Sequence, residues 1–273
     1  MKRLLSVLLV VTMAASMLTG CGNKSDQSRL DKIKEAGKIQ VATEPYFAPY
    51  EFIDNTKQGD LQYQGADMQL ARYIAEEMGV ELEIVPLEFS AVLTGISDGK
   101  YDLAISGLGY TAERAESMEL SEAYFTEDVD IHGLLVKEEN VSKYKALSDF
   151  DGLKIAYQSG SLQDTYANSQ LKDITPMPFD DVAKAVLAVQ EGKADAAAVS
   201  YDNGALFCQS NEGIGMCEPL FSSDGAGVVI AAPKGETELI EEINKIVAKS
   251  KETEMYATWW DEAKKLAAGL GLE

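Results

Sequence analysis

Two segments of the chain bring small residues to the point where a predicted strand meets a predicted helix. Residues 103–107 and residues 155–160 each run from an apolar strand into a Ser-Gly pair, and a helix start follows each pair. In open α/β sheets, ligands bind at the carboxyl ends of strands, where helix N-termini present free N–H groups to an anion. Two such helix ends facing each other predict a site for a carboxylate between two parts of the molecule.

Two hydroxyl groups and one arginine stand at or near these helix N-termini. Thr111 can cap the helix that carries Glu113 and Arg114, and Ser161 can cap the next one, with Asp164 three residues further on. The planar guanidinium of Arg114 suits a carboxylate, which it can bind through two parallel hydrogen bonds. The alternative is a surface arginine in a Glu-rich helix, where ion pairs stabilise weakly.

The composition excludes several other chemistries. The 273 residues include 45 Asp and Glu against 24 Lys and Arg, a formal net charge of −21, with no basic run. This charge repels a phosphate backbone, so we expect no nucleic-acid partner. One His and three Cys argue against a structural zinc site, an iron–sulfur cluster and a Ser-His-Asp triad. We therefore predict no metal and no cofactor.

The N-terminus has the pattern of a secretory signal. Lys2 and Arg3 precede a mostly apolar stretch, residues 4–18, which is too short and too interrupted by Ser and Thr for a good membrane span. The following Leu-Thr-Gly-Cys resembles the bacterial lipoprotein processing box, in which Cys21 takes the lipid. An ordinary signal peptide with an incidental Cys is the alternative.

This pattern predicts the compartment. We expect residues 1–20 to be a signal peptide and residues 21–29 a tether, so that the lipid on Cys21 anchors the protein to the cell membrane outside the cytoplasm. Cys208 and Cys217 have eight residues between them and are a candidate disulfide in that compartment. Two buried thiols are the alternative, because spacing alone does not determine geometry.

Strands and helices alternate along the chain, which predicts an α/β protein with mostly parallel sheets covered on both faces. We expect strands at residues 39–43, 81–85, 103–105, 153–157 and 194–199. We expect helices at residues 30–36, 66–78, 90–97, 162–171, 181–190, 238–251 and 255–270. The last two helices would pack on the outside, with Trp259 and Trp260 as core anchors.

A local repeat indicates that the plan is duplicated. Residues 96–104 and 189–197 share one pattern of apolar, acidic, Gly, Lys, Asp and Ala positions, in each case from a helix end into a strand. Coincidence between two common turns is the alternative. Extended segments at residues 131–136 and 225–232 bracket the second half, and we expect them to be crossover strands between two lobes. Lobe 1 would comprise residues 30–132 with 226–273, and lobe 2 residues 133–225.

Several segments together carry a family resemblance. They are residues 41–44, 49–52, 65–71, 99–102, 106–114 and 158–161. In their order and spacing, the chain resembles the bacterial extracellular solute-binding proteins of family 3, the polar amino-acid-binding components of ABC importers, from about residue 38 to residue 260. The resemblance implies a two-lobed periplasmic-binding-protein fold of type II with two hinge strands. A ligand would bind in the cleft, close the lobes and present the closed form to a membrane permease.

Carried over position by position, the resemblance also implies the ligand site. Arg114 would bind the α-carboxylate with help from the Gly107 N–H group. Phe47 would stack on the ligand side chain, and Glu44 would read a polar group on it. Further ligand-binding positions are Tyr50, Phe89 and Ser161.

Three positions depart from the family pattern. Gly109 stands where a Ser or Thr is usual, Leu162 where a Thr is common, and Ser200 where an Asp binds the α-ammonium. Asp202 can substitute for that Asp, or it can simply stabilise a helix N-terminus. Without a carboxylate at the amine, the ligand would not be a standard α-amino acid, and the pocket would be more apolar. Its further linings would be Tyr46, Tyr110, Tyr157 and Tyr201.

These observations predict a monomeric, lipid-anchored substrate-binding protein of an ABC importer that captures a small carboxylate-bearing solute, an amino acid or a derivative, and is not an enzyme. Two alternatives stay open. One is a cyclohexadienyl-dehydratase-like enzyme on the same fold, with Glu44 as general acid. The other is a ligand sensor for a signalling partner. The chain contains no Gly-x-x-x-x-Gly-Lys-Ser/Thr loop, so it cannot itself energise transport.

Overall fold

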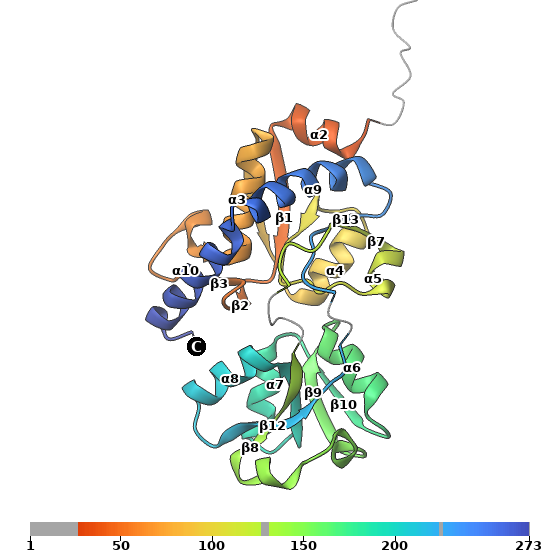
Figure 1. The fold of residues 1–273 in the computed structure, drawn as a ribbon, viewed down its shortest axis with the longest axis vertical. Coiled ribbons are helices and arrows are strands. Elements are labelled where there is room, and N and C mark those ends of the chain that lie inside the picture. Colours follow the sequence, from red (N-terminus) through yellow and green to blue (C-terminus); the bar gives the residue numbers. More distant parts are fainter. Residues whose placement is uncertain (1–26, 127–130, 224–225, 273) are drawn as a thin grey trace, which may run out of the picture.

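The protein folds into two α/β lobes, each built on a five-stranded sheet (Figure 1). The computed structural model describes residues 27–126, 131–223 and 226–272. Across these ranges, no helix is both long and apolar enough to cross a membrane. The expected signal peptide, Cys21 and Gly225 lie outside the described residues.

The first lobe contains the sheet β5-β1-β6-β13-β7. Its strands are β1 (Lys38–Thr43), β5 (Glu81–Pro86), β6 (Leu103–Ala104), β7 (Met118–Leu120) and β13 (Ala231–Pro233). Its helices are α2 (Arg29–Ala36), α3 (Ala66–Met78), α4 (Phe89–Ser97), α5 (Ala112–Ser117), α9 (Thr237–Glu252) and α10 (Met255–Leu270). A small antiparallel sheet, which the sequence did not predict, is formed by β2 (Tyr46–Phe47), β3 (Glu51–Ile53) and β4 (Tyr63–Gln64), with the 3₁₀ helix η1 (Gly59–Gln62) before β4.

The second lobe contains the sheet β10-β9-β11-β8-β12. Its strands are β8 (His132–Lys137), β9 (Lys154–Gln158), β10 (Thr175–Phe179), β11 (Ala196–Ser200) and β12 (Ile214–Leu220). Its helices are α6 (Leu162–Gln170), α7 (Val182–Gln190) and α8 (Tyr201–Ser210), with the 3₁₀ helices η2 (Glu138–Lys143) and η3 (Leu147–Phe150). The helices and the five sheet strands expected from the alternation therefore exist, with ends within about two residues of the expected ones, whereas the extended segment expected at 225–232 contains a strand only from Ala231.

The two sheets share one topology. In each, one strand runs antiparallel to both of its neighbours: β13 in the first sheet and β8 in the second. The remaining strands run in one direction, so the expectation of mostly parallel sheets is confirmed. The local repeat enters β6 in one lobe and β11 in the other, the third strand of each order, through turns at Gly99 (φ 71°) and Gly192 (φ 73°). The repeat therefore marks equivalent positions in the two lobes.

The two segments expected as crossover strands contain strands of the sheets. β8 lies within the second sheet between β11 and β12, and β13 lies within the first sheet between β6 and β7. In the second segment, Val228 makes single bridges to Gly109 and Phe125. The chain passes from the first sheet to the second between β7 and β8 and returns between β12 and β13, so the two expected segments adjoin the two connections between the lobes.

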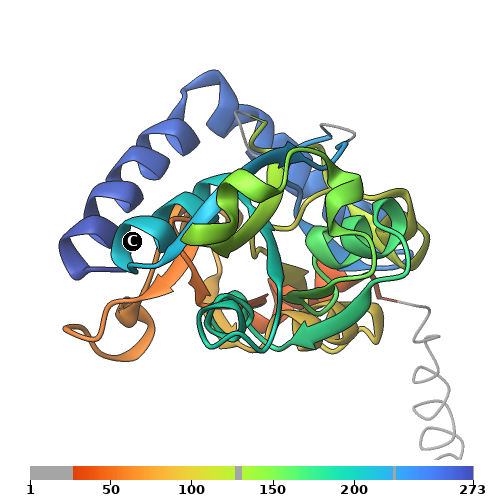
Figure 2. The ribbon, with the colours of Figure 1, turned by 90° about the horizontal axis from the view of Figure 1, so that it is seen from below.

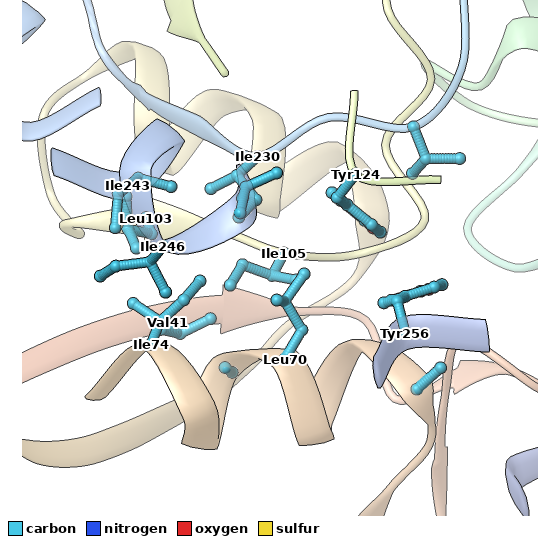
Figure 3. Close-up of a cluster of buried hydrophobic side chains, with 14 of the residues drawn as sticks. Val41, Leu70, Ile74, Leu103, Ile105, Tyr124, Ile230, Ile243, Ile246 and Tyr256 are labelled. Atoms are coloured by element: carbon cyan, nitrogen blue, oxygen red, sulfur yellow. The ribbon is translucent and has the colours of Figure 1, made fainter. Parts of the chain in front are cut away.

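The core of the first lobe lies on both faces of its sheet. Helices α3, α9 and α10 cover one face and α4 covers the other. Val41 packs toward the first face while its neighbour Ala42 packs toward the second, because successive strand residues alternate. Figure 3 shows the larger cluster, in which strand side chains meet helix side chains. Its labelled residues include Val41, Leu70, Ile74, Leu103, Ile105, Ile230, Ile243 and Ile246.

The second sheet separates the two cysteines. Cys217 on β12 packs in the cluster that includes Ala167 of α6, whereas Cys208 on α8 packs in the cluster on α7 at the opposite face. Both are free thiols, so the predicted disulfide is wrong. Burial raises the pKa of the Cys217 thiol to about 11.

Helix α10 runs along the outside of the first lobe, and its C-terminal end approaches the side on which α8 lies (Figures 1 and 2). Trp259 and Trp260 are half-buried and pack against the core, which confirms their role as anchors. The Trp260 ring lies 4.6 Å from the Tyr50 ring and 4.7 Å from the Phe125 ring, measured between centroids. Trp260 thereby supports the loop after β1.

Substitution of Gly65 tests how the loop after β1 is held in place. Its φ is +122°, and an added Cβ would lie 2.0 Å from the Tyr50 carbonyl oxygen. We expect Gly65→Ala to lower the free energy of unfolding by about 3 kcal/mol, because backbone would have to move. The matched control is Gly79→Ala, where φ is +68° and nothing lies within 4 Å, so only about 1–2 kcal/mol is expected. Urea denaturation measures both, and equal losses would contradict this steric account.

Candidate functional site

A cavity lies between the lobes at the carboxyl ends of β1, β6, β9 and β11. All eleven residues predicted for the ligand site line it. They are Glu44, Phe47, Tyr50, Phe89, Gly107, Gly109, Arg114, Ser161, Leu162, Ser200 and Asp202. Anywhere in the described part of the chain, no group of three or more His, Cys, Asp or Glu side chains is placed to hold a metal ion.

Arg114 is buried at one end of the cavity. The Thr111 hydroxyl accepts from the Arg114 backbone N–H (3.0 Å), as the capping pattern predicts. Nη1 donates to the Gly109 carbonyl, and Nη2 donates across the cleft to the Gly160 carbonyl at 2.9 Å. None of the Asp or Glu side chains that the structure describes forms a salt bridge with Arg114. Burial lowers its pKa to about 10, which still leaves the guanidinium charged at neutral pH.

Aromatic side chains line the wall beside Arg114. The guanidinium carbon lies 5.6 Å from the centre of the Phe89 ring, which suits a cation–π contact. Phe47 and Tyr50 stack with their ring centroids 5.2 Å apart. Gly107 allows this arrangement, since a Cβ there would lie 3.0 Å from the Phe47 ring. Phe47 and Tyr50 therefore form one rigid face of the cavity.

Glu44 makes another contact between the lobes and is only 3% exposed. Its Oε1 accepts from Gln158 Nε2 of the second lobe at 2.6 Å, and its backbone N–H donates to Ser106 Oγ at 2.9 Å. Burial is the main cause that raises the pKa of Glu44 to about 7, and the nearby carboxylate of Asp181 adds to it. The carboxyl group is thus poised between its two protonation states at neutral pH.

A second, outer cavity meets the first at Glu44. Its acidic lining residues are Glu44, Glu88, Asp180 and Asp181. Lys184 pairs with Asp180 and, at 2.9 Å, with Asp181. Four carboxyl groups against one lysine make this end of the cleft attractive to a cation.

The predicted role of the Gly107 N–H group is not what the structure shows. This N–H donates to Asp67 Oδ2 at 2.7 Å, so it is already satisfied inside the protein. Asp67 also accepts from the hydroxyls of Tyr124 and Tyr256, the latter at 2.6 Å. The sequence did not reveal Asp67 as the acceptor, because the two residues are 40 positions apart.

A second buried carboxyl group, Glu51, lies beside Asp67. Burial and the Asp67 charge raise the pKa of Glu51 well above its usual range. The Glu51 carboxyl group is therefore protonated, and its O–H can donate a hydrogen bond to the Asp67 carboxylate. Ser106 Oγ donates to Glu51 Oε1 at 3.0 Å. Sequence reasoning missed this pair, which holds the strand end of β6 against the loop after β1.

The first two departures from the family pattern are in contact with each other. A Cβ at Gly109 would lie 2.6 Å from Leu162 Cδ1. A side chain at position 109 would therefore require the Leu162 side chain to shift in this structure. Ser161, which precedes Leu162, caps α6 by accepting from the Asp164 N–H at 3.1 Å, as expected.

The third departure, Ser200, lies beside groups that the sequence did not single out. Asp202 is exposed in the first turn of α8, and both interpretations of it stay open. His132 and Asn203 also line the cavity, and each has a buried polar atom with no hydrogen-bond partner. Burial lowers the pKa of His132 to about 4. In the sequence, the one feature that could have drawn attention to His132 is that it is the single histidine of the chain.

The proposed tyrosine linings are wrong for the inner cavity. Tyr110 and Tyr201 are exposed, and Tyr46 lines the outer cavity instead. Tyr157 is buried, with its hydroxyl accepting from Asn168 at 3.0 Å. None of the four lines the cavity that holds Arg114.

The comparisons with known proteins agree with this geometry. The model of the bacterial extracellular solute-binding proteins, family 3, matches residues 39–262. The chain belongs to this family. The resemblance predicted from about residue 38 to residue 260 is confirmed, as is the two-lobed fold.

Relatives of this solute-binding protein include transport proteins and one enzyme. It is 27% identical over 246 residues to the arginine-binding extracellular protein ArtP of Bacillus subtilis, which covers 88% of this chain and 89% of ArtP. It is 27% identical over 182 residues to cyclohexadienyl dehydratase of Pseudomonas aeruginosa, and the match covers 66% of this chain and 65% of the dehydratase. A solved structure with a similar fold is that of AbpA, an amino acid ABC transporter substrate-binding protein of Streptococcus pneumoniae, bound to L-arginine. Its TM-score is 0.79 and its sequence identity 30%, and the match covers 89% of this chain and 99% of the AbpA chain.

The raised pKa of Glu44 predicts that the stability of the folded protein depends on pH. Glu44 has its pKa raised to about 7 in the folded protein, so it favours folding while protonated and loses that contribution as pH rises from about 4.5 to above 7. We expect Glu44→Gln to be more stable than the unchanged solute-binding protein at pH 8, by up to about 3 kcal/mol, and equally stable at pH 4.5. Urea denaturation at both values measures this. Glu113→Gln on the exposed face of α5 is the control, and a pH-independent difference for Glu44→Gln would contradict the assignment.

Proposed function

We propose that this solute-binding protein captures an α-amino acid with a positively charged side chain and delivers it to an ABC permease when its lobes close. The observation that carries the proposal is Arg114, a buried guanidinium in the cleft with no salt bridge to any described carboxylate. An isolated buried charge is costly unless a partner neutralises it. A solute carboxylate that enters from solution is the natural partner.

The acidic groups at Glu44 and in the outer cavity support a cationic side chain. Glu44 closes the inner cavity, and the carboxylates of Glu88, Asp180 and Asp181 surround the outer one. The formal net charge of −21 also attracts cations to the protein over longer distances. A solute with a carboxylate at one end and a cation at the other matches this polarity. The L-arginine named for AbpA and the arginine named for ArtP are solutes of that kind.

The anchoring and the lobe boundaries belong to the same proposal. The lipoprotein pattern at Cys21 supports a monomer tethered outside the cytoplasm. The proposed boundaries are residues 30–132 with 226–273 for lobe 1 and residues 133–225 for lobe 2, except that His132 begins β8 of the second sheet and so belongs to lobe 2. Arg114 from one lobe bonds Gly160 of the other, and such cross-lobe bonds are the contacts that opening of the cleft would break.

Arg114 gives the direct test. We expect Arg114→Ala to weaken L-arginine binding by about 2–5 kcal/mol, because the solute carboxylate would lose its desolvated partner. Isothermal titration calorimetry measures the affinity. Arg72→Ala is the control, since Arg72 bonds the carbonyls of Asp60 and Tyr63 outside the cavity. Unchanged affinity in a folded Arg114→Ala protein would remove the central assignment.

The side-chain preference is tested with a matched pair of solutes. L-Citrulline has the shape of L-arginine without its charge, so we expect the protein to bind L-arginine at least about tenfold more tightly. In Glu44→Gln this preference should shrink, because one carboxyl group of the acidic end is gone. A preference for citrulline, or one that Glu44→Gln leaves untouched, would contradict the proposed subsite.

A second candidate function is a dehydratase acting on a cyclic dienyl acid. Glu44, with its pKa raised to about 7 in the cleft, is suited to act as a general acid, and one relative is cyclohexadienyl dehydratase. An ultraviolet assay for aromatic product from prephenate or arogenate decides between the candidates. Turnover that Glu44→Gln abolishes would support the enzyme, whereas tight binding of L-arginine without turnover supports the transport protein.

A further inference from the structure

The second-lobe wall of the cavity contains an imidazole with one nitrogen unpaired. His132 is the one histidine of the chain and is 3% exposed. Its Nδ1 lies 2.9 Å from Gln163 Nε2. Its Nε2 is buried and has no hydrogen-bond partner among the described residues. A buried polar group without a partner costs free energy, so a native protein retains one where something else completes it.

The contact with Gln163 determines which nitrogen carries the proton. The amide nitrogen of Gln163 can only donate, so Nδ1 accepts and the proton of the neutral ring lies on Nε2. Burial lowers the pKa of His132 to about 4, which keeps the ring neutral at physiological pH. The unpaired group is therefore an uncharged N–H donor, which suits an oxygen atom and not a cation.

The position of His132 relates it to the altered part of the site. His132 pairs with Ser200 across β8 and β11, and Ser200 replaces the Asp expected there. Gln163 directly follows Leu162, which packs against Gly109 where hydroxyl groups are usual. Asn203, on the same wall, contributes a second unpaired atom, the acceptor Oδ1. The cavity thus lacks the expected hydroxyls and carboxylate but has a spare donor and a spare acceptor beside their positions.

We propose that His132 is a specificity-determining residue, whose Nε2–H donates to an oxygen of the bound amino acid in place of the hydroxyl donors absent at Gly109 and Leu162. Gln163 is a positioning residue that selects the tautomer. The inference rests on the proposed function, because it takes the solute to be an α-amino acid. A neutral donor adds a hydrogen bond without placing a second positive charge in the cavity that already holds Arg114.

The single histidine allows a direct spectroscopic test. With ¹⁵N-labelled histidine, the protein gives one imidazole spin system that needs no assignment by mutation. We expect the neutral Nε2–H tautomer throughout pH 6 to 8, and a shift of the Nε2–H signal when L-arginine is added. The opposite tautomer, or a protonated ring in this range, overturns the inference.

Variants measure the contribution to binding. We expect His132→Phe to lose at least about tenfold in affinity for L-arginine, while the ligand-free protein keeps its melting temperature. His132→Gln retains an N–H donor and should lose less. Tyr144→Phe, which alters the core of the same lobe away from the cavity, is the control for packing. Equal affinity in His132→Phe and the unchanged protein overturns the inference.

The two proposals fail in distinguishable ways. If L-arginine or L-lysine raises the melting temperature while the His132 signal and the affinity of His132→Phe stay unchanged, the role of His132 is refuted and the proposed function survives. If neither raises the melting temperature, the proposed function is refuted, and the role of His132 with it.

Discussion

The closed cleft depends on how one buried charge is satisfied. The Arg114 guanidinium is bonded by a carbonyl from its own lobe, that of Gly109, and by a carbonyl from the other lobe, that of Gly160. Carbonyl dipoles stabilise a cation only in part, and a carboxylate is the stronger partner. A solute that supplies the carboxylate therefore stabilises the closed form in particular. In the proposed function, binding and closure are coupled for this reason, since a ligand shifts a conformational equilibrium by its differential affinity for the two states.

The remainder of the cleft has the opposite polarity. Glu44 makes the second cross-lobe hydrogen bond, to Gln158, and the acidic outer cavity begins at the same carboxyl group. The cleft therefore contains one buried basic group, Arg114, and an acidic region that begins at Glu44. Behind it, the pair of Glu51 and Asp67 ties the loop after β1 to β6 and to Tyr256 of α10. This buried network holds the acidic end in place without taking part in the cavity.

The departures from the family pattern are explained by one another. Gly109 and Leu162 are in contact, and a side chain at position 109 would require the Leu162 side chain to shift. At Ser200 the loss of a carboxylate coincides with unpaired atoms on His132 and Asn203. A change at one position of a tightly packed site alters what its neighbours can do. The residues at these altered positions therefore have to be interpreted together with the residues that they contact.

The sequence by itself determined most of the helices and the central strands that carry the site. Helix periodicity and the caps at Thr111 and Ser161 act within a few residues, so they predicted the helices and placed Arg114 in the first turn of one of them. Tertiary structure decided what no local pattern carries. The capture of the Gly107 N–H by Asp67, the meeting of Gly109 with Leu162, and the separation of two cysteines by a sheet all depend on distant residues. Such contacts form only once the lobes have packed, because packing and not sequence separation brings those atoms together.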